Sequence, residues 1–248
     1  MEALLTHPSA KFPFLVANLI CGRICSLPPT PPPKQDEKNR YEADKRTRDL
    51  IKDWASWYTP LRRRTMHAVT IAEILLILAR SNPSILNNPS LAFFTPLLNN
   101  PVLSRLRITR TFLVGSLLIY AATAIRLLCY RTLGRHFTFQ LAILPQHKLI
   151  TAGPYSVVRH PAYTASVIFN FAVVLCQLGR GSWLKEVVMS RAGASVGWGV
   201  AWGLAVSATS YLLVSRIPKE DMVLKREFGE QWDKWAEKTK YRLIPGIY

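Results

Sequence analysis

Three long apolar runs constrain the fold of this chain more than any other feature of its sequence. They cover Phe112–Tyr130, Ala162–Leu178 and Ala194–Ser215. About 20 apolar residues in a helix cross the ~30 Å hydrocarbon core of a bilayer, so each run predicts a membrane-spanning helix. Two weaker apolar stretches, Phe12–Leu27 and Met66–Ala79, predict a short first span or anchor and one further span. We therefore expect an all-α integral membrane bundle of about four to five spans.

The charge of the chain fits the same class of protein. Its 248 residues include 32 Lys and Arg against 15 Asp and Glu, which gives a formal net charge of +17. The basic clusters flank the apolar runs, a pattern typical of cytosolic loops and of contact with anionic lipid. A nucleic-acid-binding protein would instead carry this charge on a polar, foldable domain. The sequence therefore indicates membrane lipid, and no nucleic acid, as a partner.

The composition divides the chain into two parts. Residues 1–65 combine the first apolar stretch, the proline-rich stretch Pro28–Pro33 and a charged stretch, Lys34–Arg64, which predicts an exposed linker. Residues 66–248 form the expected membrane domain. Within that domain, the prolines and asparagines of Ser81–Pro101 favour a loop or a re-entrant hairpin over a continuous helix.

The four cysteines, Cys21, Cys25, Cys129 and Cys176, all lie in apolar stretches. Their spacing does not fit a disulfide framework. Cys21 and Cys25 would share one face of a helix, but two thiols without further ligands make a poor metal site. We expect four small buried side chains and no bound metal.

Four apolar residues near the end of the chain recur with helical spacing among charged neighbours: Leu224, Phe228, Trp232 and Trp235. This spacing predicts an amphipathic helix. We expect it to lie on the membrane face and to cap the C-terminal, cytosolic part of the protein.

Polar residues concentrate in two segments, which we expect at the same membrane surface. His147–Tyr163 lies between two spans, and Arg216–Asp221 follows the last span directly. Gly153-Pro154 predicts a turn, and His160-Pro161 predicts the start of a helix, since proline is tolerated in the first turn. Backbone N–H groups at such a helix start can face an anion.

These segments carry motifs in a recognisable order. The first reads His-x-Leu-x-Thr-x-Gly-x-Tyr-x-x-x-Arg-His-Pro-x-Tyr and the second Arg-x-x-x-Glu-Asp-x-x-Leu, and they are followed by Phe-Gly-x-x-Trp and Ile-Pro-Gly-Ile. Together they resemble the isoprenylcysteine carboxyl methyltransferase family over roughly Leu133–Tyr248, whereas residues 1–130 match only as membrane spans. The resemblance implies a multi-pass membrane enzyme, usually of the endoplasmic reticulum. It also implies that this enzyme uses S-adenosyl-L-methionine to methylate the C-terminal carboxylate of a prenylated cysteine in proteins.

The resemblance implies roles only for residues that match the family's motifs. The implied cofactor contacts are Gln140, His147, Lys148, Leu149, Ile150, Tyr155, His160, Pro161, Ala162, Tyr163 and Glu220. Arg216 matches the substrate-binding arginine. The sequence departs from the family at Ala162, Ala165 and Asp221, where Ser, Gly and Glu are usual. The two alanines change helix packing slightly beside the site, and the shorter acid leaves the role of Asp221 open.

Methyl transfer to a carboxylate sets simple chemical requirements. The reaction is an in-line displacement at a sulfonium carbon, so it needs two reactants held at attack distance. A carboxylate is already an anion at pH 7 and requires no general base. Arg159 or Arg216 could clamp it with a planar guanidinium, which makes both candidate catalytic residues. Glu220 could accept hydrogen bonds from the cofactor's ribose hydroxyls or amino group.

Structural interpretations compete with these roles. Arg216 and Glu220 are spaced i, i+4 and could form an exposed ion pair. The histidines could be loop residues at the interface. Glu73 and Arg126 lie inside apolar segments, where charge is costly, and we interpret both as bundle-facing or snorkelling groups without a functional role.

Three other functions stay open from the sequence. The first is a phospholipid or other small-lipid methyltransferase, because the Arg-His-Pro and acidic-pair motifs are shared more widely than the substrate. The second is a sterol reductase with a nicotinamide cofactor, which resembles this family in its C-terminal membrane region but needs more spans. The third is a non-catalytic membrane protein, which would bind no cofactor.

Overall fold

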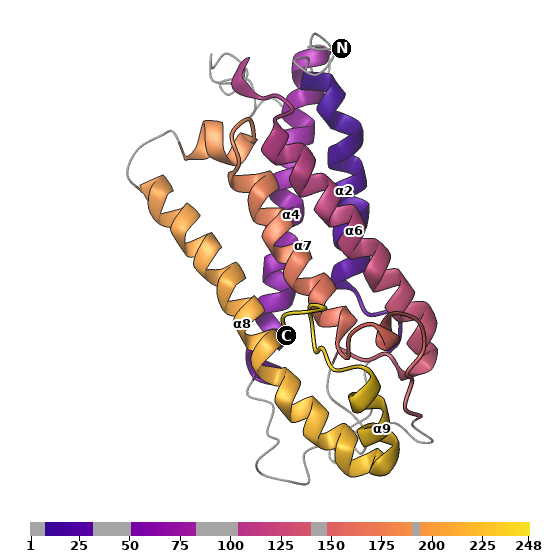
Figure 1. Ribbon diagram of the computed structural model, residues 1–248. Helices are drawn as coiled ribbons and strands as arrows, with labels where there is room; N and C mark the ends of the chain where they lie inside the picture. Colours follow the sequence, from indigo (N-terminus) through magenta and orange to yellow (C-terminus); the bar gives the residue numbers. More distant parts are fainter. Residues whose placement is uncertain (1–7, 32–50, 83–103, 140–147, 190–193) are drawn as a thin grey trace. The chain divides into compact units, whose positions relative to one another are not determined.

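The computed structural model describes residues 8–31, 51–82, 104–139, 148–189 and 194–248, and within these ranges the regular structure is entirely helical (Figure 1). The α-helices are α2 (Phe12–Ser26), α4 (Ile51–Ser81), α6 (Arg110–Leu133), α7 (Pro161–Leu178), α8 (Ala194–Phe228) and α9 (Glu230–Lys238). Short helices are η1 (Pro8–Lys11), η6 (Gly134–His136), η7 (Gly153–Ser156) and the π-helix η8 (Leu184–Val188). The all-α prediction is confirmed for the described residues.

Three helical segments are long and apolar enough to cross a membrane: Arg110–His136, Pro161–Leu178 and Val196–Phe228. They contain the predicted spans Phe112–Tyr130 and Ala162–Leu178 and all but the first two residues of Ala194–Ser215. Helix α2 has 15 residues, and α4 has 31 but is not among these segments. The expected number of four to five spans therefore depends on α2 and α4.

Helix α4 begins earlier than the sequence predicts. It includes residues 51–64, which the charge pattern assigned to an exposed linker, and the expected boundary between residues 65 and 66 falls inside it. The linker interpretation is wrong here, because Tyr58 and Arg62 are buried and Arg62 Nη1 donates a hydrogen bond to Asn170 Oδ1 at 3.0 Å. Residues 32–50, and residues 83–101 of the predicted loop, lie outside the described residues.

Helix α8 ends later than predicted. It passes Ser215, contains Pro218 and continues to Phe228. The expected amphipathic helix is divided by Gly229, which has a positive φ of 53° and separates α8 from α9. The tryptophans of α9 are buried inside the protein, so the prediction that this apolar face lies on the membrane is wrong for Trp232 and Trp235.

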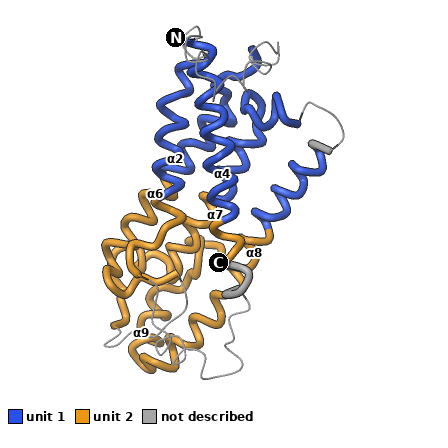
Figure 2. The backbone as a smooth tube through the Cα atoms, turned by 180° about the vertical axis from the view of Figure 1, so that it is seen from behind, with its two compact units in different colours: residues 1–23, 61–120, 170–207 blue, residues 24–60, 121–169, 208–248 orange. Residues whose placement is uncertain are grey.

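The chain forms two compact units, coloured separately in Figure 2. Unit 1 contains residues 1–23, 61–120 and 170–207, and unit 2 contains residues 24–60, 121–169 and 208–248. The helices α2, α4, α6, α7 and α8 contribute residues to both units.

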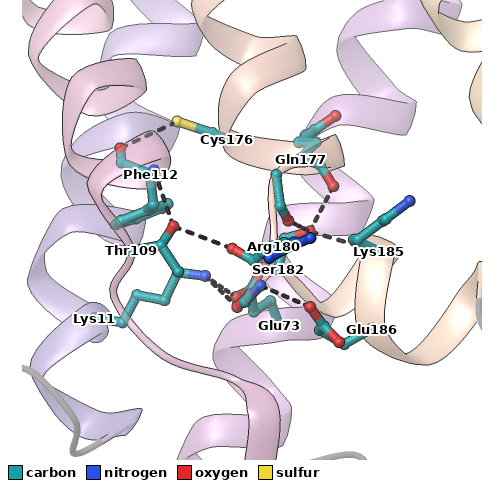
Figure 3. Close-up of polar contacts among 12 residues, drawn as sticks. Lys11, Glu73, Thr109, Phe112, Cys176, Gln177, Arg180, Ser182, Lys185 and Glu186 are labelled. Atoms are coloured by element: carbon teal, nitrogen blue, oxygen red, sulfur yellow. Dashed lines mark hydrogen bonds and ion pairs between the residues drawn. The ribbon is translucent and has the colours of Figure 1, made fainter.

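Unit 1 contains a buried ion pair. Lys11 Nζ lies 2.5 Å from Glu73 Oε1, donates to the carbonyl oxygen of Gly181 at 2.9 Å, and sits 4.3 Å from the ring centroid of Phe112 (Figure 3). The side chain of Lys11 is fully buried. Glu73 is therefore a bundle-facing group, as predicted, and its charge is compensated inside unit 1.

The start of α6 is fixed by a hydroxyl group in the same region. Thr109 Oγ1 accepts from the backbone N–H of Phe112 at 3.2 Å, which is the usual N-cap arrangement. The same hydroxyl donates to the carbonyl oxygen of Arg180 at 3.1 Å (Figure 3). The loop after α7 is thereby tied to the first turn of α6.

Unit 2 contains an aromatic cluster of Cys129, Phe137, Tyr155, Trp232 and Trp235. Trp235 Nε1 donates to the backbone carbonyl oxygen of Tyr155 at 3.0 Å, so the indole is both packed and hydrogen-bonded. This cluster connects η7 and α9 with the end of α6.

Arg126 is the second charged residue that we expected to be bundle-facing. Its Nη1 donates to the carbonyl oxygen of Ala162 and to Ser166 Oγ, both at 2.8 Å, and its guanidinium carbon lies 4.8 Å from the ring centroid of Phe139. The charge is satisfied within unit 2, in agreement with the structural interpretation.

Candidate functional site

The two polar segments of the sequence meet within unit 2. Gly153, with a φ of 61°, opens the short helix η7, and Pro161 is the first residue of α7. Both the predicted turn and the predicted helix start are therefore confirmed. The second segment, Arg216–Asp221, lies inside α8 and not at a helix start.

Glu220 on α8 contacts the first turn of α7. Tyr163 donates its hydroxyl hydrogen to Glu220 Oε2 at 2.6 Å, and His160 Nδ1 lies 3.9 Å from the same oxygen. The rings of His160 and Tyr163 are stacked, with centroids 5.6 Å apart and planes at 10°. Both contacts use Oε2, and the Glu220 side chain is 27% exposed. Oε1 is therefore the oxygen that can accept a hydrogen bond from a ligand.

Asp221, the next residue, has a different environment. Its Oδ1 lies 2.9 Å from His160 Nε2, and its Oδ2 lies 3.6 Å from Arg159 Nη2 and 3.3 Å from Arg242 Nε. Only 7% of its side chain is exposed. The carboxylate thus faces three basic side chains of the protein itself.

The C-terminal residues 241–243 bind the corner that precedes α7. The backbone N–H groups of Arg159 and His160 donate to the carbonyl oxygens of Tyr241 at 2.9 Å and Arg242 at 2.8 Å. We expected N–H groups at this helix start to face an anion, and for these two residues that expectation is wrong. The chain's own carbonyl groups occupy them.

Arg216 lies one helical turn before Glu220 and is buried, with 6% of its surface exposed. Its Nη1 donates to the backbone carbonyl oxygen of Phe139 at 3.1 Å. The alternative of an exposed ion pair between Arg216 and Glu220 is wrong, because the guanidinium of a surface pair would lie in solvent and that of Arg216 is buried.

Tyr155 lies at the base of this region and is buried in the aromatic cluster. Burial, and then the proximity of Cys129, raises the pKa of its hydroxyl well above the usual value of about 10. It is therefore a neutral hydrogen-bonding group at physiological pH.

The other expected cofactor contacts are distributed unevenly. Leu149 and Ala162 pack against the aromatic cluster, Pro161 is buried in the α7 start, Lys148 is exposed and Ile150 is half-buried. Gln140 and His147 lie outside the described residues. The structure therefore gathers Arg159, His160, Tyr163 and Glu220 around one place, with Tyr155 and the aromatic cluster in the same unit.

The sequence did not predict three parts of the site: Arg242, the backbone of the C-terminal residues and Trp232. The guanidinium carbon of Arg159 lies 5.5 Å from the ring centroid of Trp232. The terminal Ile-Pro-Gly-Ile motif marked this part of the chain, but backbone acceptors leave no residue-type signal.

The polar atoms of this region fit S-adenosyl-L-methionine, the cofactor that the motifs imply. Glu220 Oε1 can accept from its hydroxyl or amino groups. Among the described residues, the buried N–H groups Arg159 Nε and Trp232 Nε1 have no hydrogen-bond partner, and each can donate to a carboxylate. The region thus offers both an anionic acceptor and unused buried donors.

Comparison with known proteins finds one matching family model and similar proteins of two kinds. The model of the isoprenylcysteine carboxyl methyltransferase (ICMT) family matches residues 114–184. The probable protein-S-isoprenylcysteine O-methyltransferase of Oryza sativa subsp. indica is 31% identical over 130 residues, covering 51% of this chain and 57% of that protein. Protein-S-isoprenylcysteine O-methyltransferase B of Arabidopsis thaliana is 29% identical over 129 residues, covering 50% and 55%. Delta(14)-sterol reductase ERG24B of Gibberella zeae is 25% identical over 117 residues, covering 41% of this chain and 24% of the reductase.

The chain spans about half the length of the methyltransferases it matches. The family match includes α7 and the Arg159-His160-Pro161 corner, whereas Arg216 and Glu220 lie beyond it. With this match and these relatives, the chain is similar to the isoprenylcysteine carboxyl methyltransferase family over part of its length.

Proposed function

We propose that this protein is an S-adenosyl-L-methionine-dependent methyltransferase that esterifies the C-terminal carboxylate of isoprenylated cysteine in proteins. One observation carries the proposal. The carboxylate of Glu220, which accepts a hydrogen bond from Tyr163, lies one helical turn from the buried guanidinium of Arg216. Glu220 can accept hydrogen bonds from a ligand, and Arg216 can bind an anion. We place the enzyme in the endoplasmic reticulum membrane as a multi-pass protein, in contact with lipid.

Glu220 and the corner before α7 are the proposed cofactor-binding groups. Tyr163 and His160 fix the direction of the Glu220 carboxylate, whose Oε1 accepts from the ligand. Arg159 Nε and Trp232 Nε1 are the proposed donors to a carboxylate. The bound cofactor supplies a methyl group on a positively charged sulfur. Gln140 and His147–Ile150 remain proposed contacts from their motif.

Arg216 is the proposed clamp for the acceptor carboxylate, and Arg159 is the second candidate for that role. A guanidinium offers two parallel N–H groups to a carboxylate, which orients the acceptor as well as attracting it. The Arg216 contact with Phe139 fixes one end of this side chain. Because the acceptor is already ionised, the protein's task is to hold and orient it, and no group need remove a proton.

The experiment is methyl transfer by the purified full chain in detergent. Calorimetry first measures binding of S-adenosylhomocysteine. Radiolabelled S-adenosylmethionine is then supplied with either an S-prenylated cysteine or phosphatidylethanolamine. We expect label on the prenylcysteine, released as volatile methanol by mild base, as a methyl ester requires.

Other outcomes would replace the proposal. Label that resists base and appears on the phospholipid would identify a lipid amine methyltransferase. Absence of S-adenosylhomocysteine binding, combined with oxidation of a nicotinamide cofactor in the presence of a sterol, would identify a reductase.

A further inference from the structure

We infer that Asp221 is a positioning residue that ties the C-terminal tail, residues 241–248, and the start of α7 to α8, and so sets the geometry of the cofactor site. The inference rests on the proposed function, since the site it orders is the one assigned to the cofactor. It also answers the question that the sequence left open at Asp221.

The contacts of Asp221 come from two separate parts of the chain. Arg159 and His160 precede α7, and Arg242 belongs to the tail, yet all three lie within 3.6 Å of the Asp221 carboxylate. The Asp221 side chain is 7% exposed. A buried carboxylate that faces several basic groups is compensated by them, and its charge is therefore used within the protein.

The backbone reinforces the same connection. The tail accepts hydrogen bonds from the N–H groups of Arg159 and His160, and Thr164 Oγ1 donates to the carbonyl oxygen of Leu243 at 2.8 Å. The tail closes on itself through the carbonyl oxygen of Tyr248, which accepts from the N–H of Leu243 at 2.8 Å. The tail is thus a folded part of unit 2 that covers the first turn of α7 (Figure 1).

Two neighbouring acids of α8 therefore have different tasks. Successive residues of a helix point about 100° apart. Glu220 contacts Tyr163 in the first turn of α7, and Asp221 contacts His160, which directly precedes α7. The two contacts fix the register of α7 against α8 within unit 2. Glu220 has one carboxylate oxygen available for a ligand, and Asp221 fixes the position of the residues around it.

The test is a set of binding measurements with S-adenosylhomocysteine on the full chain. Asp221→Asn keeps the size of the side chain and removes its charge, and we expect the Kd to rise about tenfold. Asp221→Glu restores the charge and should recover most of the affinity. Arg242→Gln alone should raise the Kd about threefold, and added to Asp221→Asn it should have little further effect, because both changes break the same contact.

A second variant avoids the charged cluster. Thr164→Val removes a hydroxyl that donates to the carbonyl oxygen of Leu243 at 2.8 Å and lies 3.3 Å from that of His160. We expect a measurable loss of affinity although Thr164 is not among the groups proposed to touch a ligand. It serves as the test if Asp221→Asn does not fold.

The results separate the inference from the proposed function. A wild-type chain that does not bind S-adenosylhomocysteine would overturn both. A wild-type chain that binds, with additive effects of Asp221→Asn and Arg242→Gln, or with affinity unchanged in Asp221→Asn and Thr164→Val, would overturn the positioning role alone. Lower unfolding temperature with unchanged affinity would likewise reduce Asp221 to a structural residue.

Discussion

The buried charges of unit 1 and unit 2 are arranged in opposite ways. In unit 1 a single ammonium, that of Lys11, is enclosed by the carboxylate of Glu73, the carbonyl oxygen of Gly181 and the ring of Phe112. In unit 2 the carboxylates of Glu220 and Asp221 both contact His160, and Asp221 also faces Arg159 and Arg242. Glu220 contacts its neighbours through Oε2. The first arrangement is closed, whereas the second leaves polar atoms for a ligand.

This difference shows how charges in a membrane protein can be interpreted. An ionisable residue inside an apolar segment is costly and attracts a functional interpretation. The more informative property is whether any of its polar atoms lacks a partner. Among the described residues, no buried side-chain atom of Lys11 or Glu73 lacks a hydrogen-bond partner, whereas the corner with Arg159 has an unpartnered, buried Nε. The predictions below test this distinction.

The largest effect on stability should follow from breaking the buried ion pair of Lys11 and Glu73. Lys11→Met leaves the Glu73 carboxylate buried without its cation, a change that costs about 3–5 kcal/mol. We expect a clearly lower unfolding temperature, measured by circular dichroism in detergent. The affinity of the folded protein for S-adenosylhomocysteine should stay unchanged, and a large loss of affinity would contradict the comparison.

Two controls accompany that variant. Lys234 forms an exposed pair with Glu230, so Lys234→Met should leave the unfolding temperature unchanged. The double variant Lys11→Met with Glu73→Leu removes both charges and should recover most of the lost stability.

The next effect concerns Glu220. Glu220→Ala removes the charged acceptor from the proposed cofactor site, and losing a charged hydrogen bond costs about 1.5–3 kcal/mol, or roughly ten- to a hundredfold in affinity. Calorimetry with S-adenosylhomocysteine measures the change. Glu227→Ala, which removes an exposed carboxylate from the same helix, is the matched control. Equal affinities in the two variants would show that Glu220 does not hold the cofactor.

A smaller and more selective effect is expected at Arg216. Arg216→Ala should raise the KM for a prenylcysteine acceptor about tenfold while cofactor affinity stays the same, since its proposed partner is the acceptor carboxylate. Arg216→Lys should recover only part of the loss, because an ammonium lacks the planar fork. Wild-type kinetics in both variants would leave Arg216 a structural role through its hydrogen bond to the carbonyl oxygen of Phe139.

The smallest effect should be that of pH. A cysteine α-carboxylate has a pKa of about 3.3 to 3.7, so between pH 6 and 8 the acceptor is already ionised. Burial raises the pKa of Tyr155, which therefore stays protonated throughout this range. We expect kcat/KM to vary only a few-fold over this range. A tenfold rise per pH unit, with the chemical step limiting, would instead indicate an amine acceptor.

The apolar runs made the spans predictable, because length and hydropathy alone decide whether a helix can cross a membrane. The motif order also located the corner before α7. The first turns of α4 could not be predicted as helix because their charged residues resemble a linker. The burial of Arg62 against Asn170 depends on a helix distant in the sequence. The last span was expected to end at Ser215 because polar residues follow it, yet α8 continues to Phe228. The partners of Asp221 could not be read from the sequence, because Arg159 and Arg242 meet only after the tail folds back.

Pro218 has a consequence for the motion of α8. A proline has no N–H to donate, so the carbonyl group of Val214 loses its usual partner four residues later and the turn between them is held by one hydrogen bond fewer. Arg216 lies within this turn and Glu220 directly after it. A small bend here would change the separation between Arg216 and Glu220, the two proposed reactant-binding groups. Such bending belongs to microsecond-to-millisecond dynamics, and we expect the amides of this turn to exchange their hydrogens faster than those elsewhere in α8.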